Sequence, residues 1–444
     1  MIAPPSRGAI GSMRVLFVTP SDTGSGEAVT AAHIAGRLTR RAATVAALTS
    51  PSTAAFFSGE CVESTVTLTG ERAQNRRLWD QTLEQFRPQA IVFADFPLMY
   101  FSSGVPPLAD DEWLRGLAES GVVVATLDHL GYAQRSQQVF FGPAHCSLHC
   151  ETLPQTPEWI PLLLPCPMQP PGPIAGRRGI PVRFWDLPLS LPADTREEVR
   201  RTYLDHPDDV LVFHAVPGWA WRIADRYGLP LHRFLARILK HYFEGLSRPV
   251  TVVSVNNGAL LEPIDETGFR VRNLSSLPRE RFESLMLSAD LMISEYGISS
   301  ALGKALCGGV PAVAFRNSFG LMRIVEQADA GLKALVLEIE RCRLGAVFPF
   351  EVYPIWTRAD LAGIGPWWEE DAACGVDRFE LFGGDPTRKR LHALLDDPHE
   401  KVEARRRLQA FVEQAAALPA AEDVLENLVT GAARVRQSTR GARR

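Results

Sequence analysis

The sequence has no long apolar segment and no strong excess of either charge. No stretch reaches the roughly 18 consecutive apolar residues that a membrane-spanning helix needs. The first twelve residues lack the apolar core of a signal peptide, so we expect a cytoplasmic protein, with Met13 as an alternative start. The 47 Lys and Arg residues nearly balance 51 Asp and Glu residues, for a formal net charge of −4. Nucleic-acid binding needs clustered positive charge, so we expect no nucleic-acid partner.

Cysteine is scarce, with seven residues in a chain of 444. An odd and scattered set does not predict a disulfide framework. Cys146, His149, Cys150 and Cys166 come nearest to a metal cluster, but their spacing fits no zinc template and favours buried or loop thiols. We therefore expect neither a metal site nor a resident cofactor.

Short apolar runs alternate with helical patterns along most of the chain. Continuous apolar strands separated by helices are typical of a parallel sheet that is covered on both faces. Strands are expected at 15–18, 45–48, 90–94, 122–127, 210–214, 250–255, 269–271, 291–294 and 311–315. Helices are expected at 27–41, 72–86, 111–119, 194–203, 231–246, 279–288, 299–307, 387–395, 399–416 and 420–430.

Proline and glycine gather near residue 170, and the alternation restarts after them. The pattern predicts an α/β protein with two Rossmann-like domains. The first domain covers residues 13–165, a linker covers 166–190, and the second domain covers 191–397. C-terminal helices over 398–437 are expected to pack back toward the first domain.

Residues 281–318 carry the strongest sign of a ligand site. The strand at 291–294 leads through Glu295 and Gly297 to a helix that begins near Ser299. Backbone N–H groups and the dipole at a helix start suit a phosphate, and glycine allows close approach of the backbone. Ser299 and Ser300 add hydroxyl groups. A capped helix after a tight turn, with no ligand, is the alternative.

This segment resembles the donor-binding half of the GT-B glycosyltransferases. Ala289-Asp290 precedes the strand, a glycine turn and a short helix follow it, and Gly309-Val310-Pro311 precedes the next strand. The run 379–382 ahead of a helix resembles an element of the lipid A disaccharide synthases. The likeness is strongest to their branch, which includes the peptidoglycan GlcNAc transferases, and it covers much of the C-terminal half.

The resemblance implies a GT-B fold, in which two Rossmann-like domains face an interdomain cleft. It implies transfer of a sugar from a UDP- or dTDP-linked donor. Metal independence is expected too, because the chain has no Asp-x-Asp, the metal-binding signature of the other glycosyltransferase fold, GT-A. The donor-binding residues that the resemblance implies are His214, Glu295, Gly297, Ile298, Ser299, Ser300, Phe350 and Glu380.

One departure from the family concerns the donor ribose. Many relatives carry an acidic residue on the helix after the glycine turn, where this chain has Gly303 and Lys304. Glu295 or Glu380 could take its place. A strand-end salt bridge at Glu295 and a satisfied core histidine at 214 are the alternatives. Phe350 could equally pack in a core, and Lys304 could be a surface residue or neutralise a phosphate.

The loop after the first strand contains Gly24 and Gly26 but lacks the third glycine of a dinucleotide-binding loop. An NAD site is therefore not favoured. In GT-B enzymes the same loop faces the cleft and often carries the base that activates the acceptor, which here would be Asp22 or Glu27. An Asx-turn at Asp22 and a carboxylate that favours the helix dipole at Glu27 are the alternatives.

Asp95, Asp128 and His129 also follow expected strands. With Gly24 and Gly26 they could shape the acceptor site, or one of them could serve as the base. A buried Asp–His pair that orients a loop is the alternative.

The acceptor cannot be read from the sequence. A natural product, a peptide, a lipid and a saccharide all stay open, and so does a homo-oligomer. Two other functions fit the same fold. A nucleotide-sugar 2-epimerase would need no acceptor. A non-catalytic protein that binds a nucleotide sugar, or a partner subunit, would fit the missing ribose acid.

Overall fold

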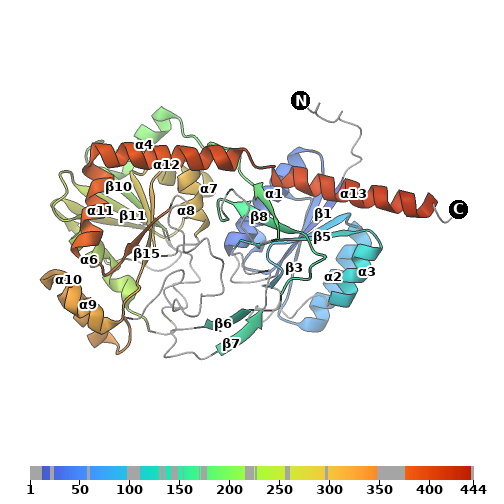
Figure 1. Cartoon of the computed structure of the whole chain (residues 1–444), viewed down its shortest axis with the longest axis horizontal. Helices are drawn as coiled ribbons and strands as arrows, with labels where there is room; N and C mark the ends of the chain where they lie inside the picture. Colours follow the sequence, from blue (N-terminus) through green and yellow to red (C-terminus); the bar gives the residue numbers. More distant parts are fainter. Residues whose placement is uncertain are drawn as a thin grey trace. The chain divides into compact units, whose positions relative to one another are not determined.

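A computed structural model describes most of the chain, in two compact units (Figure 1). The described residues are 13–20, 25–57, 61–97, 111–129, 133, 137–141, 149–153, 155–169, 171, 178–215, 225, 228–255, 261–295, 299–347 and 376–441. Unit 1 comprises residues 1–137, 152–185 and 418–444. Unit 2 comprises residues 138–151 and 186–417.

Unit 1 is built on a seven-stranded sheet with the strand order β3-β2-β1-β4-β5-β8-β9. Every strand pair in this sheet is parallel. Its strands are β1 (Arg14–Thr19), β2 (Thr44–Thr49), β3 (Ser64–Thr67), β4 (Ala90–Phe93), β5 (Val123–Leu127), β8 (Leu162–Cys166) and β9 (Ile180–Arg183). Its helices are α1 (Ser25–Arg40), the 3-10 helix η1 (Ala54–Phe57), α2 (Arg72–Phe86), α3 (Asp111–Glu119) and α13 (Ala421–Gly441).

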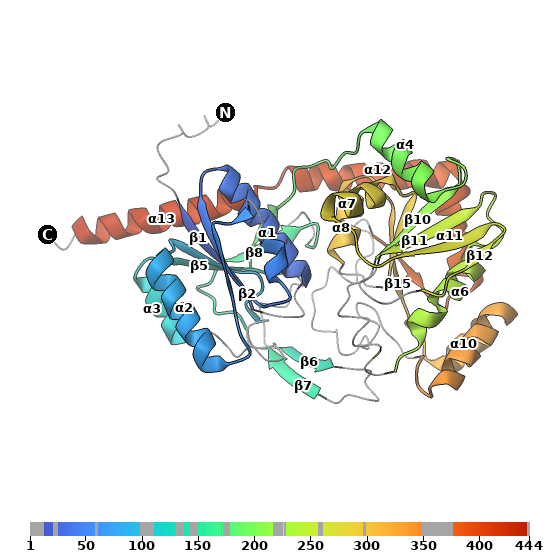
Figure 2. The ribbon, with the colours of Figure 1, turned by 180° about the vertical axis from the view of Figure 1, so that it is seen from behind.

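Helices cover both faces of this sheet, which explains why its central strands are apolar throughout. All four residues of β4 and five of the six in β1 are buried. The chain moves one way along the sheet through α1 and returns through α2 and α3. Right-handed crossovers therefore place α1 on one face and α2 and α3 on the other, as Figures 1 and 2 show.

The C-terminal segment completes unit 1. Helix α13 packs on α1, β5 and β9. The Arg37 guanidinium of α1 meets the Glu422 carboxylate of α13 at 2.6 Å, and both side chains are buried. The backbone N–H of Arg183 in β9 donates to the carbonyl of Pro419 at 3.0 Å.

Unit 2 contains a second seven-stranded sheet, with the order β12-β13-β11-β10-β14-β15-β16. All its strands pair in parallel except β12, which forms an antiparallel hairpin with β13. Its strands are β10 (Val210–Ala215), β11 (Val250–Val255), β12 (Asp265–Glu266), β13 (Phe269–Leu274), β14 (Leu291–Ser294), β15 (Ala312–Arg316) and β16 (Asp377–Glu380). A separate two-stranded sheet joins β6 (Gln137–Phe141) and β7 (His149–Leu153).

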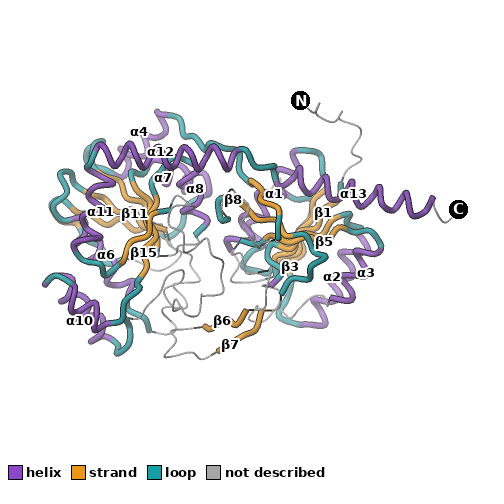
Figure 3. Tube along the Cα trace, in the orientation of Figure 1, coloured by secondary structure: helices purple, strands orange, loops and turns teal. Residues whose placement is uncertain are grey.

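Helices also flank both faces of the second sheet (Figure 1), with α6, α10 and α11 on one side and α7 and α8 on the other. The helices of unit 2 are α4 (Ala193–Tyr203), α6 (Leu231–Phe243), α7 (Arg279–Ser288), α8 (Ser300–Cys307), α9 (Leu321–Gln327), α10 (Ala330–Cys342), α11 (Asp385–Asp396) and α12 (Pro398–Ala416). Within each unit, Figure 3 shows the strands at the centre and the helices outside.

The two sheets share one winding. In each, the first strand lies in the interior of the sheet, the chain builds outward on one side, and then crosses to the other side. This arrangement confirms the predicted α/β class with two Rossmann-like domains and C-terminal helices. None of the helices in the described part of the chain has the length and apolar character that a bilayer crossing requires.

The units divide the chain differently from the expected domains in three places. Strand β9 lies inside the expected linker over 166–190. It can form despite Pro181 because it is an edge strand, where a proline is tolerated. Residues 138–151 group with unit 2, although the first domain was expected to cover 13–165. Of the C-terminal helices expected over 398–437 to pack toward the first domain, only α13 groups with unit 1, and α12 belongs to unit 2.

Candidate functional site

Both sheets reverse their strand order at one point. In open α/β sheets, ligands bind beyond the carboxyl ends of the strands at this point. The reversal lies between β1 and β4 in unit 1, and between β10 and β14 in unit 2. The chain therefore supplies two groups of predicted site residues, one for each unit.

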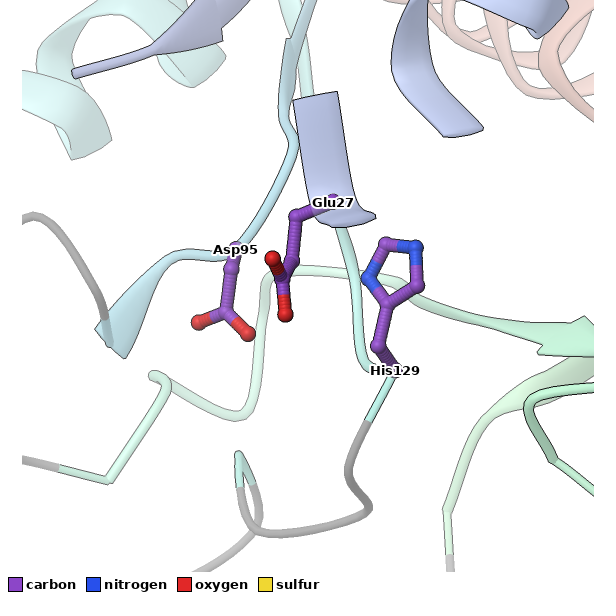
Figure 4. Close-up of side chains that lie close together, drawn as sticks. All are labelled: Glu27, Asp95 and His129. Atoms are coloured by element: carbon purple, nitrogen blue, oxygen red, sulfur yellow. The ribbon is translucent and has the colours of Figure 1, made fainter. Parts of the chain in front are cut away.

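In unit 1, the structure brings together Glu27, Asp95 and His129 (Figure 4). Glu27 lies in the first turn of α1, while Asp95 and His129 lie just beyond β4 and β5. One donor atom from each side chain lies within 4.8 Å of the other two. The Glu27 carboxylate lies between the other two side chains in Figure 4. Three residues distant in sequence thus form one cluster at the reversal point, which we call the unit 1 cluster.

The carboxyl group of Glu27 has a pKa well above its usual range. The residue is half-buried, and burial raises the pKa of its carboxyl group to about 7, against a smaller opposing effect of its own backbone. Near neutral pH the carboxyl group is therefore present in both forms. A group with this pKa can take a proton from a substrate and release it again.

His129 and Asp95 are almost fully buried, with 1% and 3% of their surfaces exposed. Burial lowers the pKa of His129 to about 3, although the nearby backbone of Ala94 opposes this slightly. Neither ring nitrogen of His129 makes a hydrogen bond with another described residue. The imidazole is thus neutral near pH 7 and can bond to a group that enters the cluster.

Asp128 precedes His129 in the sequence, and its side chain is also buried. It makes no hydrogen bond to the His129 ring. Its backbone N–H donates to the carbonyl of Leu163 at 2.9 Å. The side-chain amide of Gln169 donates to the backbone carbonyl of His129 at 2.6 Å, which holds the backbone at His129 in place. The structure therefore does not form the Asp–His pair that was the alternative for these residues.

Two carboxylates and an imidazole within this distance could also hold a divalent cation. The described residues contain no other group of three such side chains at this spacing. Among the described side chains, the cysteines at positions 61, 166, 307 and 342 form no disulfide.

In unit 2, His214 and Glu295 join a buried polar network. The Nε2 atom of His214 lies 2.9 Å from the Glu295 carboxylate, and its Nδ1 atom lies 2.8 Å from the hydroxyl of Ser254. The Nδ1 atom of His232 lies 3.3 Å from the other carboxylate oxygen. Burial by itself would raise the pKa of Glu295, but the two histidines outweigh it and hold this pKa well below its usual range.

Sequence reasoning missed His232 and Ser254. His232 is the second residue of α6 and lies on its buried face among apolar residues, while Ser254 is a polar residue in the buried strand β11. A polar residue within a buried pattern was the available signal. Glu295 and His214 contact each other inside this network. These contacts agree with the two alternatives from the sequence, a strand-end ion pair at Glu295 and a satisfied core histidine at position 214.

Helix α8 begins as the sequence suggested, at Ser300 with Ser299 as its N-cap. The Ser299 hydroxyl accepts from the backbone N–H of Ala301 at 3.3 Å. Lys304, farther along α8, pairs with Glu283, which removes it as a free phosphate ligand.

Glu380 ends β16 and is bound by its neighbours. Its carboxylate accepts from Arg316 at 2.9 Å and from the backbone and hydroxyl of Ser318 at 2.8 and 2.7 Å. These contacts fix its orientation at the end of β15 and β16. In unit 1, Gly26 lies in α1 with open space around its Cβ position, so no close packing demands glycine there. The remaining predicted site residues lie outside the described residues: Asp22, Gly24, Gly297, Ile298 and Phe350.

A family model described as a family of unknown function, DUF6365, matches residues 34–434. The chain belongs to this family. No curated protein matches it in sequence.

Solved structures that resemble this DUF6365 member are glycosyltransferases. Glycosyltransferase VinC in complex with dTDP matches with a TM-score of 0.50 at 13% identity, over 95% of this chain and 100% of VinC. The spinosyn forosaminyltransferase SpnP matches with a TM-score of 0.51 at 15% identity, over 95% and 99%. The calicheamicin glycosyltransferase CalG4 matches with 0.50 at 14%, over 95% and 99%.

These likenesses show that the chain has the GT-B fold. They do not reach the lipid A disaccharide synthase branch, so that finer resemblance stays a prediction. They also identify no donor or acceptor for this member of the family.

Proposed function

We propose that this protein transfers a sugar from a nucleotide-diphosphate sugar to a hydroxyl group of an acceptor, with Glu27 as the general base. One observation carries the proposal. Glu27 is a half-buried carboxylate with a pKa raised to about 7, and it lies with Asp95 and His129 at the point where the sheet order of unit 1 reverses. The GT-B fold supports the same reaction class.

The chemistry is a single displacement. The acceptor oxygen attacks the anomeric carbon, its proton passes to the Glu27 carboxylate, and the bond from that carbon to the diphosphate oxygen breaks. The nucleoside diphosphate leaves with the electron pair. The neutral His129 ring hydrogen-bonds to the acceptor hydroxyl group or to Glu27, and Asp95 keeps the cluster polar. Asp22 is a second candidate for the base.

Unit 2 binds the donor in this proposal. Ser299 and Ser300 begin α8, and a helix start favours the negative charge of a phosphate. The partial positive charge of the helix start also stabilises the diphosphate as it leaves, so no metal ion is required. UDP- and dTDP-linked sugars are the donors to test first, because the similar glycosyltransferase VinC forms a complex with dTDP. Gly297, Ile298 and Phe350 remain predicted donor contacts.

The test is to incubate the full chain with UDP- and dTDP-sugars and a panel of acceptors with free hydroxyl groups, and to measure nucleoside diphosphate release and product mass. Glu27→Gln removes the base while keeping the size of the side chain. We expect kcat to fall by about 10²- to 10⁴-fold. In the wild type, kcat/KM should rise with pH through about 7 and then level off, because the base must be ionised.

Glu63→Gln is the matched control, since Glu63 is an exposed carboxylate in the same unit. It should leave kcat unchanged. A Glu27→Gln protein that is as active as the wild type would refute the role of Glu27. An isomerised nucleotide sugar without any acceptor would identify a 2-epimerase instead. Nucleotide binding without turnover of any donor would point to a non-catalytic binding protein.

A further inference from the structure

The buried network of unit 2 joins three neighbouring strands and one helix at their ends. Ser254, His214 and Glu295 come from the carboxyl ends of β11, β10 and β14, which lie side by side in the sheet. His232 approaches the same carboxylate from the start of α6. All four side chains have at most 3% of their surface exposed.

Such a network is a costly way to hold strand ends together. Removing charged and polar groups from water costs free energy that apolar side chains of the same size would not cost, so a buried ion pair is weak evidence for stability. The same strands are already closely packed through buried apolar residues such as Phe213 in β10 and Ile293 in β14. Stability alone therefore does not account for two histidines and a carboxylate at this place.

The position of the network indicates what it does. The chain leaves β10, β11 and β14 at the carboxyl edge of the sheet, around the point where the strand order reverses. Glu295 is also only four residues before Ser299, the N-cap of α8. A fixed Glu295 thus limits where the chain can place the start of that helix.

The same helix offers a comparison at its other end. His241 lies near the end of α6, where its Nε2 atom meets the Asp329 carboxylate at 2.9 Å. This pair has the same chemistry and nearly the same distance as His214 and Glu295. It is partly exposed and lies nine residues along α6 from His232, away from the strand ends.

We propose that Glu295, held by His214 and His232, is a positioning residue for the nucleotide-diphosphate site of unit 2. The inference rests on the proposed function. Glu295 does not itself contact the nucleotide, because its side chain is buried and faces the two histidines. It fixes the exit of β14 and, through it, the phosphate-binding start of α8.

The test compares nucleotide affinity with fold stability in the full chain. UDP and dTDP are titrated into each variant by calorimetry, well below the melting temperature of that variant, and the binding stoichiometry reports the folded fraction. Glu295→Gln keeps the size of the side chain and removes its charge. We expect at least a tenfold weaker Kd at unchanged stoichiometry.

Conservative variants separate positioning from simple loss of packing. In His214→Gln the amide nitrogen can occupy the place of Nε2, and in His232→Asn it can occupy the place of Nδ1. Both should bind within about threefold of the wild type, whereas His214→Ala should lose at least tenfold. Asp329→Asn is the matched control, since asparagine also caps a helix. It should change the melting temperature but not the Kd.

The outcomes distinguish the two proposals. If the wild type binds neither UDP nor dTDP, the donor site of the proposed function is refuted, and the role of Glu295 with it. If the wild type binds but folded Glu295→Gln binds equally well, only the positioning role is refuted. If Glu295→Gln does not fold, the difference between His214→Gln and His214→Ala decides, and equal Kd values would refute the role.

Discussion

Burial raises the pKa of both Glu27 and Glu295, but the pKa of the first ends above its usual range and that of the second below it. At Glu27 the loss of water outweighs the opposing effect of its own backbone, so its pKa rises to about 7. At Glu295 two imidazoles contact the carboxylate, so its pKa falls below its usual range although the side chain is more deeply buried. The first carboxylate is suited to exchange protons, and the second is suited to keep a fixed charge and a fixed place.

The raised pKa of Glu27 predicts that this residue lowers stability at high pH. Proton binding favours the folded state below the ordinary carboxyl pKa of 4.5, and this contribution is lost as the pH rises through about 7. Glu27→Gln cannot ionise there. Relative to the wild type, the variant should therefore gain about 2 kcal/mol in free energy of unfolding between pH 5 and pH 8. Urea unfolding at both pH values measures this difference.

The two proteins share every other titrating group, so these groups cancel in the comparison. Parallel stability curves for wild type and Glu27→Gln over pH 5 to 8 would show that the carboxyl group is not buried as described. At pH 8, Glu27→Gln should lose transferase activity although it gains free energy of unfolding relative to its value at pH 5 in comparison with the wild type. Opposite changes of stability and activity at one residue are typical of a catalytic group.

Several helices with a regular recurrence of apolar residues were predicted with the correct bounds, whereas strands that contain a proline were missed. Helices α2 and α3 begin and end where the sequence analysis placed them, because apolar residues recur on one face between polar ends. Strand β8 contains Pro165 and was not among the expected strands, and β9 contains Pro181 and lies inside the expected linker. Only pairing with the rest of the sheet identifies such segments as strands.

Helix α13 depends on unit 1 for its place, and unit 1 depends on α13. Its Glu422 is 1% exposed and meets Arg37, which is also buried, while Arg41 pairs with Asp423 and Glu422. Removing one partner of a buried pair leaves the other charge without compensation. We therefore expect Glu422→Ala to lower the free energy of unfolding of unit 1 by about 3 kcal/mol, measured by urea unfolding.

Asp80→Ala provides the matched control for this pair. Asp80 meets Arg76 at 3.3 Å on the exposed face of α2, and exposed pairs contribute roughly 0 to 1 kcal/mol. If both variants lose the same small amount, the contact between α13 and α1 does not stabilise unit 1 as described.

At the scale of the whole molecule, two units with the same winding carry different groups at equivalent points. Unit 1 has a carboxyl group with a raised pKa and a neutral imidazole, whereas unit 2 has a buried ionised carboxylate and a helix start. This difference fits a division of labour in which unit 1 activates the acceptor and unit 2 binds the donor.

That division predicts a reaction independent of divalent cations. Extensive treatment with EDTA should leave kcat within about twofold, because a helix start and hydrogen-bond donors stabilise the leaving diphosphate. The rate of nucleoside diphosphate release before and after treatment measures this. Loss of activity that Mg²⁺ or Mn²⁺ restores, together with loss of the metal effect in His129→Ala, would assign the unit 1 cluster to cation binding.

The sequence by itself determined the α/β class, the two similar halves and the residues at the strand ends. Apolar runs and helical periods are local properties, and strand ends follow from them directly. Asp95, Asp128, His129, His214 and Glu295 could all be named for this reason, and Glu27 because it follows the loop after the first strand.

Only the tertiary structure decided which of these residues meet. Contacts such as those of Glu27 with Asp95 and His129, or of Glu295 with His232, join residues far apart in sequence. They depend on strand order, which no local pattern encodes. The pKa values follow from the same contacts and from burial, so one carboxylate became a candidate base and the other a buried anchor only once the sheets had formed.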